Sequence, residues 1–192
     1  MKKIILASGS PRRKMLMEWA EIKFDILVSD ADESFPPEMT PSDAALLIAK
    51  NKNAAVQEML SKSVHDIDPL VISADTIVVL NAEIIGKPID REDAIRILKK
   101  LSGQKHEVIT AVAMNDGKKE IAFTDSTYVS FHALTEEQII HYVDNFKPYD
   151  KAGAYAIQEW IGVVGIKSIE GDFYNVMGLP ISRILPFIDT FV

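Results

Sequence analysis

The sequence contains no cysteine, which excludes disulfides, thiolate nucleophiles and cysteine-based zinc sites. It also lacks an apolar run long enough to span a membrane, because Arg12 and Arg13 interrupt the first such run. The start, Met1-Lys2-Lys3 followed by apolar residues 4–7, imitates a signal peptide, but its apolar core is too short. We therefore expect a cytoplasmic location and no membrane partner.

An excess of basic residues is missing as well. The chain has 21 Lys+Arg against 28 Asp+Glu, which gives a net charge of −7 and a pI near 5.1. A nucleic-acid polymer is therefore not an expected partner, because it needs a large basic face, whereas a small anionic substrate needs only a few local cations. The P-loop, the G-x-G-x-x-G fingerprint and the G-x-S-x-G elbow are absent, which disfavours P-loop NTPases, Rossmann dehydrogenases and serine hydrolases.

What is present is an ordinary globular composition. The 192 residues are 47% hydrophobic and 26% charged, enough for one domain or for two small lobes that share a core. Apolar runs predict strands at 4–7, 24–28, 70–80, 84–85, 108–114, 121–131 and 161–169. Start signals and apolar periodicity predict helices from Pro11, from Pro41, over 90–101, over 135–146 and from Pro180. This alternation predicts a mixed α/β sheet covered by helices.

The segment from Ser8 to Arg13 (Ser-Gly-Ser-Pro-Arg-Arg) joins the first strand to the first helix, with Ser10 as the N-cap. Backbone N–H groups, the helix dipole, two hydroxyls and two guanidiniums meet there, which favours a phosphate site. Helical spacing places Arg12 on the inner face with Met15, Leu16 and Trp19, so that its head is expected to point to a cleft. The alternative interpretation is an ordinary helix start with two solvated arginines.

Asp75 lies inside a strand that is apolar on both faces. An unpaired carboxylate there costs several kcal/mol or stays protonated. A metal ion, a cationic partner or a role as general base would account for it, and the alternative is a bulge or turn near the sheet edge. By alternation, Asp75 is expected on the side of Ser73, and Thr76 on the other side.

Further candidates lie on an acidic loop and on two lysines. Asp30, Asp32 and Glu33 could supply oxygen ligands to Mg²⁺ or Mn²⁺, although an acidic loop is most often only solvated. Lys52 shares the expected inner stripe of the second helix and could either reach an anionic ligand or extend to solvent. Lys87 is a second cationic candidate, between Gly86 and Pro88. The remaining members of the stripe are expected to be Ala44, Leu47, Ile48, Ala55 and Met59.

The small-residue segment 150–155 allows close approach of its backbone to a ligand. Gln158, just after it, offers the donor and the acceptor that base recognition needs, and its alternative is a surface amide. The four histidines show no ligand spacing, and we interpret them as structural or exposed: His65, His106, His132 and His141.

Taken in order, these segments resemble the Maf family of nucleoside triphosphate pyrophosphatases over nearly the whole chain. Each motif alone is weak, but the ordered set is highly specific. The matching pieces include SGSPRR at 8–13, DE at 32–33, AKNK at 49–52, ADTIV at 74–78, GKP at 86–88, LSG at 101–103, VIT at 108–110, DKAGAY at 150–155, IQ at 157–158, GD at 171–172 and VMGLP at 176–180.

The resemblance implies a single Maf-like domain over residues 1–192, with a mixed, twisted β-sheet flanked by helices and a cleft between two lobes. It also implies a metal-dependent enzyme, with Mg²⁺ or Mn²⁺, that hydrolyses a nucleoside triphosphate to the monophosphate and pyrophosphate. In the branch that acts on dTTP and UTP, the residues matching Arg12, Thr76 and Gln158 mark substrate choice, and the residue matching Asp75 accepts a proton. The branch that prefers 7-methyl-GTP typically differs at the position of Gln158.

These implications give each candidate a role. Asp75 is expected to activate water, and Glu33 together with Asp75 to hold the metal, although the sequence leaves open whether Asp75 is base, ligand or both. The phosphate-binding residues are expected to be Ser8, Ser10, Arg12, Arg13, Lys52 and Lys87. A non-catalytic nucleotide-binding regulator of cell division, a 7-methyl-GTP pyrophosphatase and a phosphomonoesterase are the alternatives. The oligomeric state is left open, with a homodimer as one option.

Overall fold

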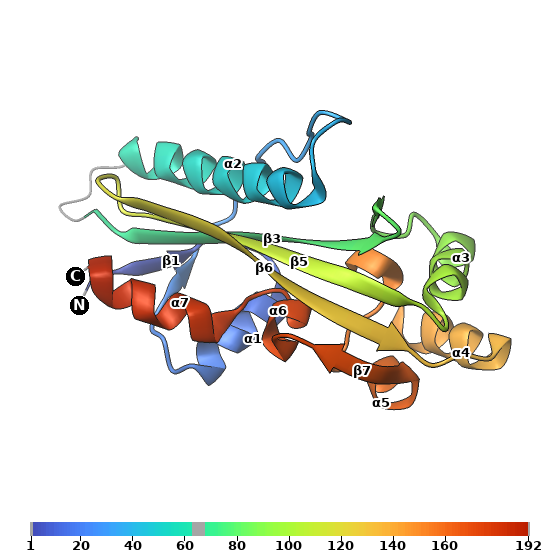
Figure 1. The fold of residues 1–192 in the computed structure, drawn as a ribbon. Helices are drawn as coiled ribbons and strands as arrows, with labels where there is room; N and C mark the ends of the chain where they lie inside the picture. Colours follow the sequence, from blue (N-terminus) through green and yellow to red (C-terminus); the bar gives the residue numbers. More distant parts are fainter. Residues whose placement is uncertain (1, 63–67, 192) are drawn as a thin grey trace. The chain divides into compact units, whose positions relative to one another are not determined.

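The computed structural model describes residues 2–62 and 68–191. Its strands form a seven-stranded mixed sheet in the order β2-β1-β3-β5-β6-β7, with β4 paired to β3 (Figure 1). The strands are β1 (Ile4–Leu6), β2 (Asp25–Ile26), β3 (Leu70–Leu80), β4 (Glu83–Ile85), β5 (Lys105–Asn115), β6 (Glu120–Phe131) and β7 (Ile166–Glu170). Strand β1 is parallel to β2 and β3, while β4 and β7 pair antiparallel to β3 and β6. The expected mixed α/β sheet is confirmed.

The helices of the described residues follow the start signals of the sequence, with additions near the end. They are α1 (Pro11–Trp19), α2 (Pro41–Ser61), α3 (Arg91–Leu101), α4 (Glu136–Phe146), α5 (Trp160–Gly165), α6 (Phe173–Met177) and α7 (Ile181–Ile188), with the 3₁₀ turns η1 (Ala152–Ala154) and η2 (Asp189–Phe191). Thr40, Asp90 and Thr135 cap their helices through side-chain oxygens, and Thr135 with Gln138 forms the expected capping box.

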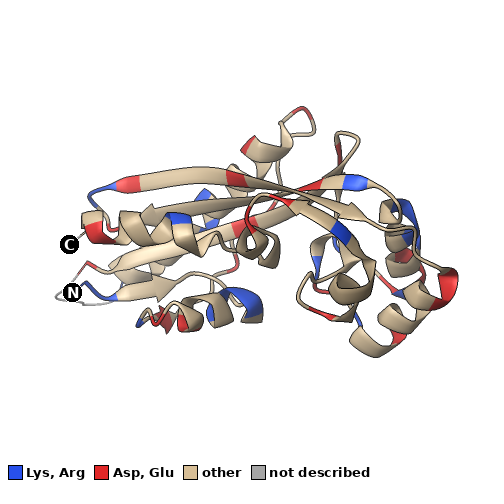
Figure 2. Cartoon of the chain, turned by 60° about the horizontal axis from the view of Figure 1, so that its bottom comes forward, with Lys and Arg blue, Asp and Glu red and all other residues tan. Residues whose placement is uncertain are grey.

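The chain forms two compact units. Unit 1 comprises the described residues of 1–75, 110–125 and 178–192, and unit 2 those of 76–109 and 126–177. In unit 1, α2 covers one face of the sheet, and α1 and α7 cover the other (Figure 1). In unit 2, α3 packs against α4. Lys and Arg residues are interspersed with Asp and Glu in each unit (Figure 2).

The predicted strand over 161–169 is wrong in its first half. Residues Trp160–Gly165 form helix α5, and only Ile166–Glu170 forms strand β7. The apolar run also fits a short helix, here one that buries Ile161 and Gly165 and exposes Val163, and the length of the run could not separate a strand from a helix. The strands expected at 70–80 and 84–85 are joined by a two-residue turn at Asn81-Ala82, where both residues have positive φ and β4 returns along β3.

A buried histidine lies in the core of unit 2. His106 is 2% exposed, its Nε2 lies 2.7 Å from the hydroxyl of Tyr155, and its ring stacks on Phe131. Burial lowers the pKa of His106 to about 4 and raises the pKa of Tyr155. His106 is therefore neutral in the folded protein at neutral pH.

This burial makes stability depend on pH. The unfolded chain takes up a proton at His106 near pH 6.5, whereas the folded chain does so only near pH 4, so stability falls as the pH drops between these values. We expect a loss of about 2 kcal/mol between pH 7.5 and pH 5. Urea unfolding at both pH values, with His106→Gln as the comparison, checks this. The same pH dependence in the variant would contradict it.

Candidate active site

Helix α2 is fastened to the sheet of unit 1 by two buried polar side chains. The Nδ2 of Asn53 donates to the carbonyls of Val71 and Ala113, both at 3.0 Å, which lie on β3 and β5. The hydroxyl of Ser73 donates to the carbonyl of Ala49 at 2.7 Å. Because buried polar groups hold a defined geometry, these bonds fix the position of α2 along β3.

This position brings three charged side chains together. The Nζ of Lys52 lies 2.7 Å from Oδ1 of Asp75 and 2.8 Å from Oε1 of Glu33. The side chains of Lys52 and Asp75 are only 18% and 14% exposed, against 53% for Glu33. Asp75 thus lies on the α2 side of β3, the side of Ser73, as alternation predicts. A cation therefore balances this mostly buried acid.

The stripe predicted for α2 is only partly right. Ala44 and Ile48 are buried as expected, but Met59 is 40% exposed, and the buried face continues through Ala45, Ala49, Asn53 and Val56. The buried face thus includes Asn53, a polar residue that an apolar pattern does not reveal.

The other acids of the loop before α2 are not part of this cluster. Oδ1 of Asp32 accepts a hydrogen bond at 2.8 Å from the backbone N–H of Ser34, which lowers the pKa of Asp32. Asn51 donates to the carbonyl of Asp32 at 3.3 Å and so ties the loop to α2. Among the residues described, no ion pair or hydrogen bond brings Asp30 to Lys52. Of the three loop acids, Glu33 is the one placed beside Asp75.

At the start of α1, the predicted phosphate-binding residues contact one another. The buried hydroxyl of Ser8 accepts from Nη1 of Arg13 at 3.1 Å and from the backbone N–H of Ser10 at 3.3 Å. The Nε of Arg13 donates to the carbonyl of Gly178 at 2.8 Å. Ser10 occupies the N-cap position, but its side chain makes no capping hydrogen bond to the helix. The first turn of α1 thus carries cations without an acidic residue, an arrangement that opposes the helix dipole and favours an anion.

The inner face predicted for α1 is only partly right, because Leu16 is buried as expected but Trp19 is not. Its buried residues are Arg13, Leu16 and Met17, whereas Trp19 is 60% exposed and Arg12 is half-buried. Compared with the predicted orientation, the helix turns Arg13 toward the interior of the unit, where its guanidinium donates to the carbonyl of Gly178 and to the hydroxyl of Ser8. The sequence signal for this contact was missed: Gly178 lies in the VMGLP motif, and its φ of +117° favours glycine.

Electrostatics connects the guanidiniums with the acids in unit 1. Burial lowers the pKa of Arg13, and the charge of Asp75 acts against this shift. Arg12 lowers the pKa of Arg13 further and Glu33 raises it, both by smaller effects. The charges of Asp75, Arg12 and Glu33 therefore all act on the guanidinium of Arg13 within the unit.

Unit 2 holds the remaining candidates, Thr76, Lys87 and Gln158. Thr76 follows Asp75 in β3, and Lys87 is exposed in the loop after β4. Gln158 is partly buried, and its Oε1 is buried without a hydrogen-bond partner among the described residues. A buried amide oxygen without a donor is costly, so the position favours a ligand with an N–H group.

A polar network supports the segment around Gln158, and sequence reasoning missed it. The hydroxyl of Tyr142 donates to the carboxylate of Glu159 and accepts from the N–H of Ala156 at 3.1 Å. The buried Nζ of Lys151 lies 2.8 Å from Asp150 and 3.6 Å from Glu159. Asp150 and Lys151 stand in the DKAGAY piece at 150–155, but the sequence does not reveal that Lys151 lies near Glu159 or that Tyr142 contacts Glu159, because these partners come together only in the folded chain.

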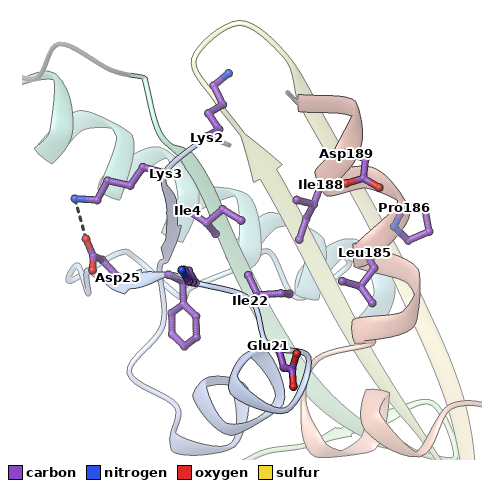
Figure 3. A pocket seen from close by; sticks show the side chains of 12 residues that line it. Lys2, Lys3, Ile4, Glu21, Ile22, Asp25, Leu185, Pro186, Ile188 and Asp189 are labelled. Atoms are coloured by element: carbon purple, nitrogen blue, oxygen red, sulfur yellow. Dashed lines mark ion pairs between the residues drawn. The ribbon is translucent and has the colours of Figure 1, made fainter.

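A separate hollow in unit 1 contains none of the candidate residues. It has a volume of about 950 Å³ and lies between the start of β1, the segment before β2 and helix α7 (Figure 3). Its wall includes Ile4, Ile22 and Ile188, and an ion pair of 2.8 Å joins Lys3 to Asp25 at its rim. Mixed charge and an apolar wall do not match a polyphosphate, so the candidate site is built on Asp75 instead.

Within 2–62 and 68–191, no group of three or more His, Asp or Glu side chains is placed to hold a metal ion, and no helix is both long and apolar enough to cross a membrane. His106 is structural, and His65 lies outside the described residues.

The sequence model of the Maf family, whose description is "Maf-like protein", matches residues 3–191 of the chain. The chain belongs to the Maf family. A dTTP/UTP pyrophosphatase of Cytophaga hutchinsonii is 50% identical over 182 residues, which cover 95% of this Maf chain and 81% of the relative. Proteins of the same name from Bacteroides fragilis and Bacillus cereus are 44% and 45% identical, covering 95% and 96% of this chain and 92% and 93% of the relatives.

A solved structure shares the fold of this Maf protein. The Ham1 protein of Staphylococcus aureus aligns over 100% of both chains with a TM-score of 0.54 and 15% sequence identity. At this identity the likeness concerns the fold alone.

Proposed function

We propose that this Maf protein hydrolyses dTTP and UTP to the nucleoside monophosphate and pyrophosphate, using Mg²⁺ or Mn²⁺. The observation that carries the proposal is the nearly full-length similarity to relatives named dTTP/UTP pyrophosphatase, the first of them 50% identical. The ion pairs of Lys52 with the mostly buried Asp75 and with Glu33, in the same unit as Arg12 and Arg13, support it.

In this proposal Asp75 takes a proton from a water molecule, whose oxygen forms a bond to the phosphorus in line with the departing pyrophosphate. The bond from that phosphorus to the pyrophosphate oxygen breaks, and the pair of electrons leaves with pyrophosphate. Lys52, Arg12 and Arg13 are assigned to the triphosphate oxygens together with Ser8 and Ser10 from the start of α1, and Lys87 is the remaining cation assigned to the phosphates. Charge on the phosphates is thereby balanced without a basic protein surface.

The donor set fits a divalent ion. Mg²⁺ and Mn²⁺ prefer carboxylate oxygens and bind through one or two of them plus substrate phosphates, and the single ammonium of Lys52 already contacts both Asp75 and Glu33. Glu33 and Asp75 are the residues that would hold the ion, which when bound screens the phosphate charge.

Base selection is assigned to Arg12, Thr76 and Gln158. The N3–H of uracil or thymine is a donor that matches the buried Oε1 of Gln158, which has no partner among the described residues. Guanine presents a different pattern of donors and acceptors on its pairing edge. Uracil or thymine thus supplies a donor to the Oε1 of Gln158.

A panel of nucleoside triphosphates with Mn²⁺, including 7-methyl-GTP, tests the proposal when products are separated by chromatography. Pyrophosphate and monophosphate from dTTP and UTP are expected. Orthophosphate as the product would indicate a phosphomonoesterase instead. Binding without turnover would indicate a nucleotide-binding regulator.

Replacing Gln158 by Ala is expected to lower the ratio of kcat/KM for UTP over GTP about tenfold, because one base-reading hydrogen bond is lost. Steady-state kinetics with both nucleotides measures this ratio. Gln104→Ala, at an exposed position before β5 in the same unit, is the control and should leave the ratio unchanged. An unchanged ratio for Gln158→Ala would remove its recognition role.

A further inference from the structure

The ammonium of Lys52 occupies the position between two carboxylates of unit 1. It lies 2.7 Å from Oδ1 of Asp75 and 2.8 Å from Oε1 of Glu33, and its side chain is 18% exposed. These are the oxygens that the proposed function assigns to the metal. Two cations this close to the same oxygens repel each other, because Coulomb repulsion is large at short range in a partly buried site.

We propose that Lys52 is a resident counter-ion that excludes the metal until a polyphosphate draws the ammonium away. This inference rests on the proposed function for the identity of the metal residues. The lysine side chain has a flexible four-carbon stem, so its ammonium can leave the carboxylates and bind a phosphate oxygen without any change in the backbone of α2. The bonds of Asn53 to β3 and β5 keep that backbone in place.

The consequence is coupled binding. Metal alone must compete with Lys52 for Asp75 and Glu33, whereas metal with nucleotide finds the two acids open and the ammonium on the phosphates. The coupling is reciprocal, so the metal also strengthens nucleotide binding by the same factor. Arg13 interacts electrostatically with Asp75 and Glu33, and a substitution at position 52 does not remove this cation.

The test measures Mn²⁺ alone. Free Mn²⁺ is followed by electron paramagnetic resonance while it is titrated into nucleotide-free protein at constant ionic strength. The Lys52→Met variant, which keeps the apolar stem but not the charge, is expected to bind Mn²⁺ about tenfold more tightly than the unsubstituted protein. Lys52→Gln is expected to do the same and covers the case in which the Met variant folds poorly.

Lys50→Met is the matched control. Lys50 lies on the same helix and also pairs with a glutamate, Glu120 at 2.7 Å, but its side chain is 43% exposed and it does not contact Asp75. Its removal changes the net charge equally, so it should leave Mn²⁺ affinity within about twofold, since exposed charges are screened. Equal tightening by Lys50→Met, or unchanged or weaker Mn²⁺ binding in both Lys52 variants, would overturn the proposal.

A second titration measures the coupling itself. With an α,β-methylene analogue of UTP present, Mn²⁺ binding to the unsubstituted protein should tighten strongly, and in Lys52→Met this gain should be about tenfold smaller. An equal gain in both proteins would also overturn the proposal. Pyrophosphate release is measured separately. If the Lys52 variants bind Mn²⁺ more tightly as expected but the unsubstituted protein releases no pyrophosphate, the proposed function is refuted and the counter-ion role of Lys52 is supported.

Discussion

Replacing Asp75 by Asn is expected to slow pyrophosphate release from dTTP about a thousandfold while the protein stays folded. The amide has almost the same size and can still accept a hydrogen bond from Lys52, whose Nζ lies 2.7 Å from Oδ1 in the native protein. It cannot accept a proton from water, and this step is the one assigned to Asp75. Steady-state kcat with dTTP measures the loss of activity, and circular dichroism checks that the variant stays folded.

A matched acid in the same unit provides the control. Asp125 on β6 is similarly covered, with a side chain 17% exposed, and pairs with one cation, Arg183 at 2.8 Å. Asp125→Asn should therefore keep kcat within about twofold, because it removes the same charge outside the candidate site. The Asp75 variant should stay inactive at saturating Mn²⁺, which separates a lost proton acceptor from a weakened metal site. Near-normal release by Asp75→Asn would refute its role.

The unusual position of Asp75 could be predicted because a strand has a period of two and an acid in an apolar strand needs a partner. The identity of the partner could not. Lys52 is 23 residues away, and its position depends on Asn53 and Ser73, whose bonds to backbone carbonyls leave no mark in an apolar pattern. The inner face of α1 was misjudged for the same reason. A guanidinium bound to Gly178 overrode the preference for burying Trp19.

Strand and helix starts were predictable wherever a local chemical signal exists. The cap at Thr135 and the turn at Asn115 are examples, since the Oδ1 of Asn115 accepts from the N–H of Gly117 as a turn requires. The run from Ile161 carries no such signal. Its helical start is set by Glu159, whose carbonyl accepts from the N–H of Gly162 at 2.9 Å, a bond that any residue type could make.

A substitution at Gly162 tests the turn between Ile157 and α5. A Cβ at this position would lie 1.7 Å from the carbonyl oxygen of Ile157, a backbone atom that no side-chain rotation can move aside. Gly162→Ala is therefore expected to lower the free energy of unfolding of unit 2 by more than about 3 kcal/mol, at the severe end of overpacking substitutions. Urea unfolding followed by the fluorescence of Trp160, two residues before the substitution, measures the loss.

Gly86 offers the contrasting case in the same unit. A Cβ at Gly86 meets nothing within 4 Å, so Gly86→Ala should change stability by no more than about 1 kcal/mol, through the entropy of the unfolded chain. A Gly162→Ala protein as stable as Gly86→Ala would contradict the tight turn between Ile157 and α5. Because Gln158 directly follows Ile157, the same backbone shift should also disturb the amide that reads the base, so any folded Gly162→Ala protein should show a reduced preference for UTP over GTP.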